Sequence, residues 1–372
     1  MKFSNVIGNS IAIERIRRMV DEDRIPHALL LHGAPGIPKL ALARATAQYI
    51  HCTHRQHGEP CGQCPSCLQH QSFNHTDTFF SYPVVKRNDR PTSDDFASEW
   101  REFLNEDSVE DFQKWVSLLN KENAQPVIYQ SESEKIIHDM SFAAYTSKYK
   151  VLIMWLPEKM NEACANKLLK MIEEPSPDSI FILVSDDAKG ILPTIFSRTQ
   201  RVELRKPNTQ QIADYLVERY QVNRQEALAL AAPADGNVVQ AERNMQLDSE
   251  TKQFNEEFKS LMRLAWMRDI KKLKAWSERV AEFKREKTRR FLVYCNRMVR
   301  ENFIYNLHCP ELNYLTPDEE QFSVKFARFI NEENCERMFA EFGRAEKDIQ
   351  ANGNAKIILL DLAIKCTILI KA

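Results

Sequence analysis

The sequence contains little glycine, only nine residues in 372. It also has no uninterrupted apolar run of about 18 residues, the length that a transmembrane helix needs. The scarcity of glycine argues against a loop-rich β protein and favours a helix-rich one. The opening residues, Met1-Lys-Phe-Ser-Asn, are not followed by the apolar core of a secretory signal. The formal net charge is −1, so the overall charge predicts no general attraction to nucleic acid.

Disulfide frameworks are also excluded by the way the cysteines are distributed. Nine cysteines are present, and four of them lie within residues 52–67. The other five share no spacing: Cys164, Cys295, Cys309, Cys335 and Cys366. This pattern favours one metal cluster plus ordinary buried thiols. It indicates a reducing, cytoplasmic compartment.

What is present is an alternation of apolar runs with helical periodicity. Four runs predict buried strands: residues 28–31, 151–155, 180–184 and 201–204. Strands that alternate with helices form a parallel α/β sheet. We expect an α/β domain over 1–206, a small helical domain over 207–247 whose first helix is capped by Thr209, and a helical domain over 248–372. We expect residues 79–130 to form an insertion of short helices and loops that adds nothing to the main sheet.

A degenerate phosphate-binding loop follows the first predicted strand. Gly33 and Lys39 stand at the first glycine and the lysine of G-x-x-x-x-G-K-[ST], and Gly36 lies between them. The second glycine of the motif is replaced by Pro38, which has no N–H to donate to a phosphate. The serine or threonine is replaced by Leu40, which has no oxygen for Mg²⁺. Lys39 alone would be read as a solvated lysine at a helix start.

The second strand of a phosphate-loop ATPase normally ends in acidic residues that hold Mg²⁺ and activate water. Here those two positions are Trp155 and Leu156, and Glu158 is displaced from them. Trp155 is best explained as a packed core aromatic. We therefore expect no ATP hydrolysis by this chain, and binding of nucleotide is doubtful.

Cys52, Cys61, Cys64 and Cys67 have the spacing C-x8-C-x2-C-x2-C. Short spacings let a tight turn direct several sulfurs at one centre, and four thiolates suit a tetrahedral structural zinc. An iron–sulfur cluster or four unrelated thiols are the alternatives. Neighbouring histidines could replace one ligand: His51, His54, His57, His70 and His75.

These motifs together resemble one family, the delta-prime subunits of the bacterial DNA polymerase III clamp loader, within the AAA+ superfamily. Besides the loop and the cysteines, the matching segments are Val6–Gly8, Ile25–Ala28, Asn166–Lys170, Glu173–Pro175, Phe181–Val184, Leu192–Ile195 and Ser197–Thr199. The segment Ser197–Thr199 differs from the family's Ser-Arg-Cys sequence, because Thr199 replaces the cysteine. The matches cover about 1–75 and 130–245, and 79–130 looks like a lineage-specific insertion.

The resemblance implies a RecA-like AAA+ domain, a small helical lid domain and a helical collar domain. It implies a subunit without ATPase activity of its own, in which Val239 stands where active relatives have a sensing arginine. It implies that Arg198, positioned by Ser197, is an arginine finger for the ATP of a neighbouring subunit. The implied partners are the gamma/tau and delta subunits and, through the assembled complex, the sliding clamp and primer–template DNA. Without the family, Arg198 would be read as a helix-capping surface residue.

Two other functions compete with this interpretation. One is an autonomous AAA+ ATPase, which the four altered positions disfavour. The other is a stand-alone zinc-containing DNA-binding protein. In such a protein, the lysines and arginines between residues 259 and 300 would contact the phosphate backbone. We favour contacts between subunits for that basic stretch over DNA binding. The simplest alternative for the basic stretch is a solvated helix face whose charges balance those of acidic neighbours.

Overall fold

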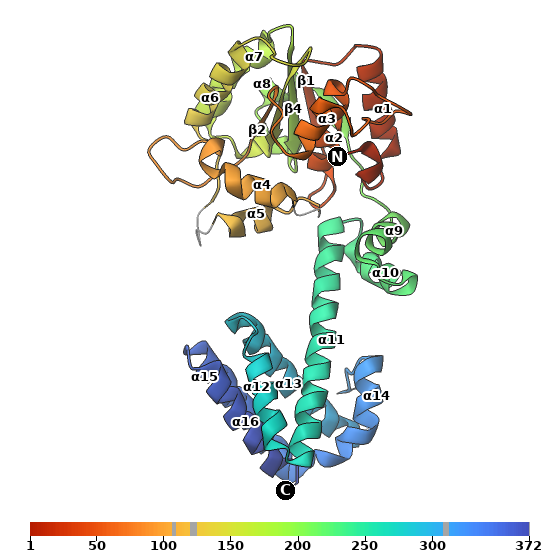
Figure 1. Ribbon diagram of the computed structural model, residues 1–372, viewed down its shortest axis with the longest axis vertical. Helices are drawn as coiled ribbons and strands as arrows, with labels where there is room; N and C mark the ends of the chain where they lie inside the picture. Colours follow the sequence, from red (N-terminus) through yellow and green to blue (C-terminus); the bar gives the residue numbers. More distant parts are fainter. Residues whose placement is uncertain (106–108, 120–124, 308–311, 372) are drawn as a thin grey trace. The chain divides into compact units, whose positions relative to one another are not determined.

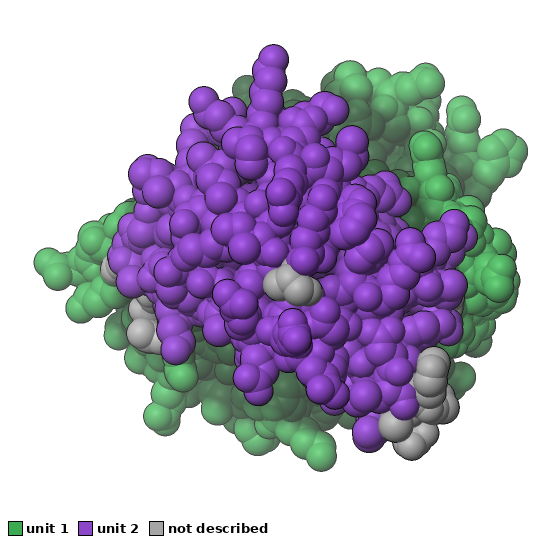
Figure 2. Space-filling model, turned by 90° about the horizontal axis from the view of Figure 1, so that it is seen from below, with its two compact units in different colours: residues 1–245 green, residues 246–372 purple. Residues whose placement is uncertain are grey.

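The computed structural model describes residues 1–105, 109–119, 125–307 and 312–371. They form two compact units, residues 1–245 and 246–372, which Figure 2 distinguishes by colour. Predicted features at Cys309, at residues 106–108 and at residues 120–124 lie outside the described residues. Within the described part, no helix has the length and apolar character that crossing a membrane requires.

Unit 1 is built on a five-stranded parallel sheet (Figure 1). Its strands, in the order β2-β3-β4-β1-β5 across the sheet, are β1 (Ala28–His32), β2 (Thr78–Ser81), β3 (Lys150–Trp155), β4 (Ser179–Ser185) and β5 (Gln200–Glu203). Every residue of β3 and β4 is buried. Parallel strands covered on both faces carry such continuous apolar runs. The predicted parallel α/β class is confirmed.

One part of the sequence prediction is wrong at the edge of this sheet. Residues 79–81 were assigned to an insertion outside the sheet, but β2 pairs in parallel with β3 from Thr78 to Ser81. Asp77 holds the start of β2, because its carboxylate accepts the backbone N–H groups of Tyr145, Thr146 and Ser147. The inserted segment therefore begins after the edge strand.

Helices surround the sheet and continue into the small helical part of unit 1. They are α1 (Ser10–Asp21), α2 (Lys39–His51), α3 (Pro65–Gln71), α4 (Ala97–Asn105), α5 (Phe112–Leu118), α6 (Gln130–Ser141), α7 (Glu162–Glu173), α8 (Pro193–Phe196), α9 (Thr209–Tyr220) and α10 (Arg224–Ala231). The cap of α9 is Asn208, whose side chain accepts the Gln211 N–H, and not Thr209 as predicted. The next helix, α11 (Val238–Met267), runs through position 247, where we expected a domain boundary.

The insertion supplies an aromatic layer over the end of β3. Trp155 is 3% exposed, and its ring centroid lies 5.5 Å from that of Trp100 and 5.2 Å from that of Phe103. Trp115, fully buried, packs edge-on against Trp100 at 5.3 Å. Trp155 is therefore the packed core aromatic that the sequence predicted.

Unit 2 is all helical, as expected. It contains the remainder of α11, then α12 (Ile270–Val280), α13 (Arg285–Asn306), α14 (Pro317–Phe326), α15 (Glu332–Gln350) and α16 (Ala355–Leu369). Trp276, Phe291 and Tyr294 are buried in its core, whereas Trp266 is 43% exposed. The apolar α16 is only partly covered, since Ile357 and Ile368 are exposed.

The aromatic layer yields a first prediction. Trp155→Ala should lower the free energy of unfolding of unit 1 by about 3–5 kcal/mol, because it leaves a cavity against Trp100 and Phe103. Trp155→Phe keeps a ring at the site and should cost clearly less. Urea unfolding of both variants, followed by circular dichroism, measures the difference. Equal stability of Trp155→Ala and the wild type would contradict the packing role.

Candidate functional site

The two glycines of the phosphate loop pack tightly against neighbouring residues of the chain. Gly36 has φ +76°, and a Cβ at this residue would lie 2.0 Å from Oδ1 of Asn237, at the start of α11. The Gly36 carbonyl accepts the Val238 N–H at 2.8 Å. A Cβ at Gly33 would lie 2.5 Å from the Leu204 carbonyl oxygen. Both glycines are therefore required for close packing, whether or not a ligand is bound.

Lys39 is not a solvated lysine, and that expectation is wrong. Its side chain is 3% exposed, with Nζ 2.8 Å from Oδ1 of Asp186 and 2.5 Å from the Ala34 carbonyl oxygen. Asp186 follows β4, at the sheet edge where the carboxyl ends of parallel strands meet. The ammonium group that would contact phosphates is thus neutralised within the chain.

The residues that follow β3, where an ATPase has its acidic pair, are also buried or hydrogen-bonded within the chain. Leu156 is 1% exposed. Glu158 accepts the backbone N–H groups of Asp186 and Asp187, at 2.9 and 3.2 Å. Burial raises the pKa of Glu158. This carboxylate orients the turn that carries Asp186, and so it acts on the partner of Lys39.

Val239 lies in the apolar cluster of the small helical part, where it is 7% exposed. It also lines the cleft beside the phosphate loop, together with Pro35, Gly36 and Leu156. A valine at this place cannot contact phosphate charge. Pro38 and Leu40 in the loop, Leu156 after β3 and Val239 in α11 thus offer no charged or oxygen-bearing side chain to phosphate or Mg²⁺.

The four cysteines converge as predicted. The Sγ atoms of Cys52, Cys61, Cys64 and Cys67 lie within 4.8 Å of one another. The Cys61 N–H donates to Cys52 Sγ, and the Cys64 N–H donates to Cys61 Sγ. Burial raises the pKa of Cys64, but N–H groups of Thr53 and Cys67 outweigh it and bring the pKa to about 6. The cluster can bind a metal such as zinc, whose tetrahedral sites take four thiolates.

The neighbouring histidines form a separate group. His51, His70 and His75 lie together, and burial lowers the pKa of His51 to about 3 and that of His70 to about 2. Their nitrogens have protein partners: His51 Nε2 lies 2.9 Å from the Tyr149 carbonyl oxygen, and His75 Nε2 lies 2.9 Å from Ser66 Oγ. We interpret them as a neutral hydrogen-bonded network that packs α2 against β2.

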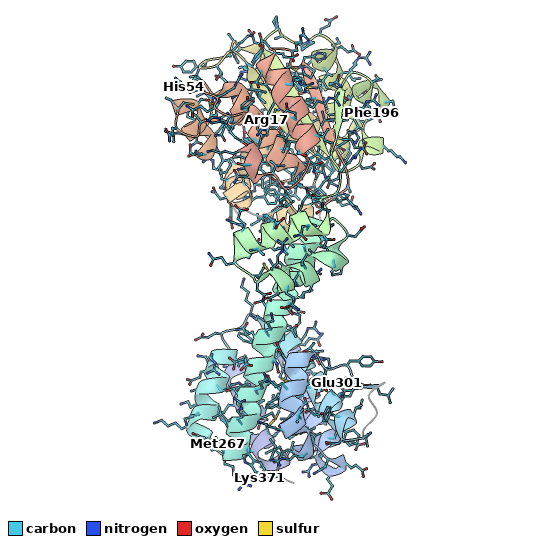
Figure 3. The ribbon with its side chains drawn as sticks, turned by 90° about the vertical axis from the view of Figure 1, so that its right-hand side faces the viewer. Arg17, His54, Phe196, Met267, Glu301 and Lys371 are labelled. Atoms are coloured by element: carbon cyan, nitrogen blue, oxygen red, sulfur yellow. The ribbon has the colours of Figure 1, made fainter. Side chains whose placement is uncertain are left out.

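Arg198 directly follows Ser197, the C-cap residue of α8. The last residue of α8, Phe196, lies on the opposite side of unit 1 from His54 in Figure 3. Its Nη2 pairs with Glu173 Oε1 at 2.9 Å, and its Nη1 donates to the Thr194 carbonyl at 2.9 Å. The Ser197 hydroxyl donates to the same carbonyl at 3.1 Å. Arg198 is 40% exposed, so solvent reaches the guanidinium. In the isolated chain, these contacts are those of a helix-capping arginine.

Several arginines in the basic stretch of unit 2 pair with acidic neighbours. Arg279 pairs with Glu257, and Arg290 pairs with Glu250, each at 2.8 Å. Arg289 pairs with both Glu286 and Glu346. These pairs support the bland explanation, a solvated helix face, over a phosphate-binding strip.

Two participants in the site were not predicted from the sequence. Asp186 is an ordinary polar residue after a strand, and the sequence offered no signal that Lys39 would pair with it. The other is the segment 110–113 of the insertion, which lines the cleft beside the phosphate loop. Its lack of apolar periodicity gave it the appearance of a loop.

Comparison with known proteins agrees with the motifs. A family model described as DNA polymerase III, delta subunit, matches residues 8–208, more than half of the chain. DNA polymerase III subunit delta′ of Haemophilus influenzae is 28% identical over 253 residues, 68% of this chain and 64% of that protein. The corresponding subunit of Pseudomonas aeruginosa is 27% identical over 218 residues, 58% of this chain and 55% of that protein. The chain thus spans less than two thirds of the length of these relatives.

One solved structure is similar to this chain only at a low level. A DNA polymerase III gamma-subunit-related protein from Thermotoga maritima covers 96% of this chain and 99% of its own, with a TM-score of 0.36 and 14% identity. That likeness is too low to support a detailed comparison. The match of the family model is sufficient by itself: this chain belongs to the DNA polymerase III delta subunit family, and the resemblance to delta-prime subunits is confirmed.

Proposed function

We propose that this chain is a non-hydrolysing subunit of a DNA polymerase III clamp loader. The observation that carries the proposal is the phosphate loop, in which Lys39 is buried against Asp186 and is flanked by Pro38 and Leu40. A subunit with this loop serves the assembly as a fixed part. Its partners would be the gamma/tau and delta subunits, and the assembled complex would load the sliding clamp on primer–template DNA.

In this proposal, Arg198 is the group that the subunit contributes to catalysis. A guanidinium placed against the γ-phosphate of a neighbouring subunit's ATP stabilises the charge that spreads over the transferring oxygens. The exposed face of Arg198 and its exchangeable ion pair with Glu173 support this role. On assembly, Arg198 would exchange Glu173 for the phosphate, while Ser197 keeps the end of α8 in place.

Zinc would be the structural metal of the cysteine cluster. Cys52, at the end of α2, and Cys64 and Cys67, at the start of α3, would be joined through it with Cys61. Four thiolates leave zinc no open position for substrate, so its contribution is to hold α3 on α2.

Arg198→Ala should leave folding and assembly intact but reduce ATP hydrolysis by the reconstituted loader. Removal of an arginine finger costs about 10³–10⁵ in rate at the site it serves. Arg201→Ala, which removes an exposed arginine from the neighbouring strand β5, is the matched control. Single-turnover hydrolysis with both variants gives the comparison. Unchanged turnover with Arg198→Ala would remove the finger assignment.

Metal analysis of the purified full-length chain should find about one zinc per chain, the content of one four-thiolate site. Cys64→Ser should lose that zinc and unfold more readily, because the link between α2 and α3 is broken. Cys164→Ser changes a buried cysteine outside the cluster and should retain the metal. A folded wild-type chain without zinc would contradict the structural site.

A further inference from the structure

The inserted segment 109–112 lies at the cleft beside the phosphate loop, which Glu110, Asp111 and Phe112 line. On one side, Val109 packs into the apolar cluster that contains Ile7, Ile212 and Leu216. On the other side, the ring of Phe112 lies 6.2 Å from that of Trp155, and Lys159 Nζ lies 4.3 Å from the Phe112 ring centroid. The segment thus connects the small helical part of unit 1 with the end of β3.

Two charged contacts attach this segment to α11. Asp111 pairs with Arg243, and its side chain also caps α5 by accepting the Gln113 N–H. Glu242, 6% exposed, accepts the Tyr215 and Tyr220 hydroxyls at 2.6 and 2.9 Å. The backbone N–H of Val109 lies close enough to the Glu242 carboxylate to favour its charged form.

Between these attachments, Glu110 points at the first turn of α2. Arg44, Lys39 and the Ala41 N–H all favour the charged form of its carboxylate, and Glu110 lines the cleft together with Pro35 and Gly36. The Ala41 N–H lies in the first turn of the helix, where no backbone carbonyl of the helix can accept it. Oε2 of Glu110 is buried without a hydrogen-bond partner among the described residues. Burial raises the pKa of Glu110.

The N-terminus of a helix that follows a phosphate loop is where nucleotide-binding proteins place a phosphate. A carboxylate satisfies the same N–H groups and the same helix dipole. We propose that segment 109–112 is an internal substitute for nucleotide, with the Glu110 carboxylate in the place of a phosphate and Val109 filling the adjoining apolar surface. The segment holds helices α9–α11 against the sheet as a bound nucleotide would.

This inference goes beyond the proposed function, because it concerns only contacts within unit 1 and stands whether or not Arg198 reaches another subunit's ATP. It explains how a subunit with an inactive loop keeps a fixed conformation. Without any ligand, Glu110 supplies a negative charge at the first turn of α2. Segment 109–112 likewise connects the small helical part to the sheet.

Amide hydrogen exchange of the full-length chain tests the proposal. Glu110→Ala should speed exchange at the first turn of α2 and in α9–α10 by about tenfold to a hundredfold, the effect of losing one hydrogen bond to a charged group. Glu110→Gln keeps an oxygen beside the Ala41 N–H but removes the negative charge, and so it should restore only part of the protection. Glu102→Ala, an exposed glutamate in the same insertion, is the matched control and should match the wild type.

A second variant keeps the proposal testable if Glu110→Ala does not fold. Asp111→Asn retains the cap of α5, since asparagine caps as well as aspartate, but removes the ion pair with Arg243. It should speed exchange at the first turns of α11. The proposal is overturned if exchange in these variants equals that of Glu102→Ala, or if the wild type binds ADP at micromolar concentration with segment 109–112 becoming exposed.

Discussion

The packing of the carboxyl edge of the parallel sheet is the constraint on which unit 1 depends. Strands β1, β3 and β4 all end there, so the phosphate loop, Trp155 and Asp186 meet at one place. In an ATPase this edge is polar and is completed by nucleotide and Mg²⁺. In this chain the edge is apolar at Trp155 and Leu156, and the charge of Lys39 is neutralised by Asp186. Residues of the chain itself therefore cover this edge of the sheet.

The insertion and the altered residues at the end of β3 are therefore structurally linked, because they pack against each other. Replacing the acidic end of β3 by Trp155 creates an apolar surface, and the insertion covers it with Trp100, Phe103 and Phe112. The same insertion brings Glu110 to the first turn of α2. The loop is held by contacts within the chain, among them the Lys39–Asp186 ion pair and the hydrogen bond from the Val238 N–H to the Gly36 carbonyl.

Much of this architecture is readable from the sequence, and the remainder has identifiable physical reasons. The buried strands were predictable because continuous apolar runs are typical of parallel sheets, and the cysteine cluster because its ligands lie close together in the chain. Strand β2 was missed because it is a half-buried edge strand with a mixed sequence, Thr78-Phe-Phe-Ser81. The partners of Lys39 and of the α2 N-terminus were missed because both contacts join residues that are distant in the chain.

We propose that this chain has no ATP turnover of its own and serves the ATP site of another subunit. ATP hydrolysis by the purified full-length chain, measured beside the complex reconstituted with gamma/tau and delta subunits, tests it most directly. The account predicts no turnover by the chain alone and increased turnover when it joins the other subunits. Turnover by the chain alone that disappears in Lys39→Ala would contradict it.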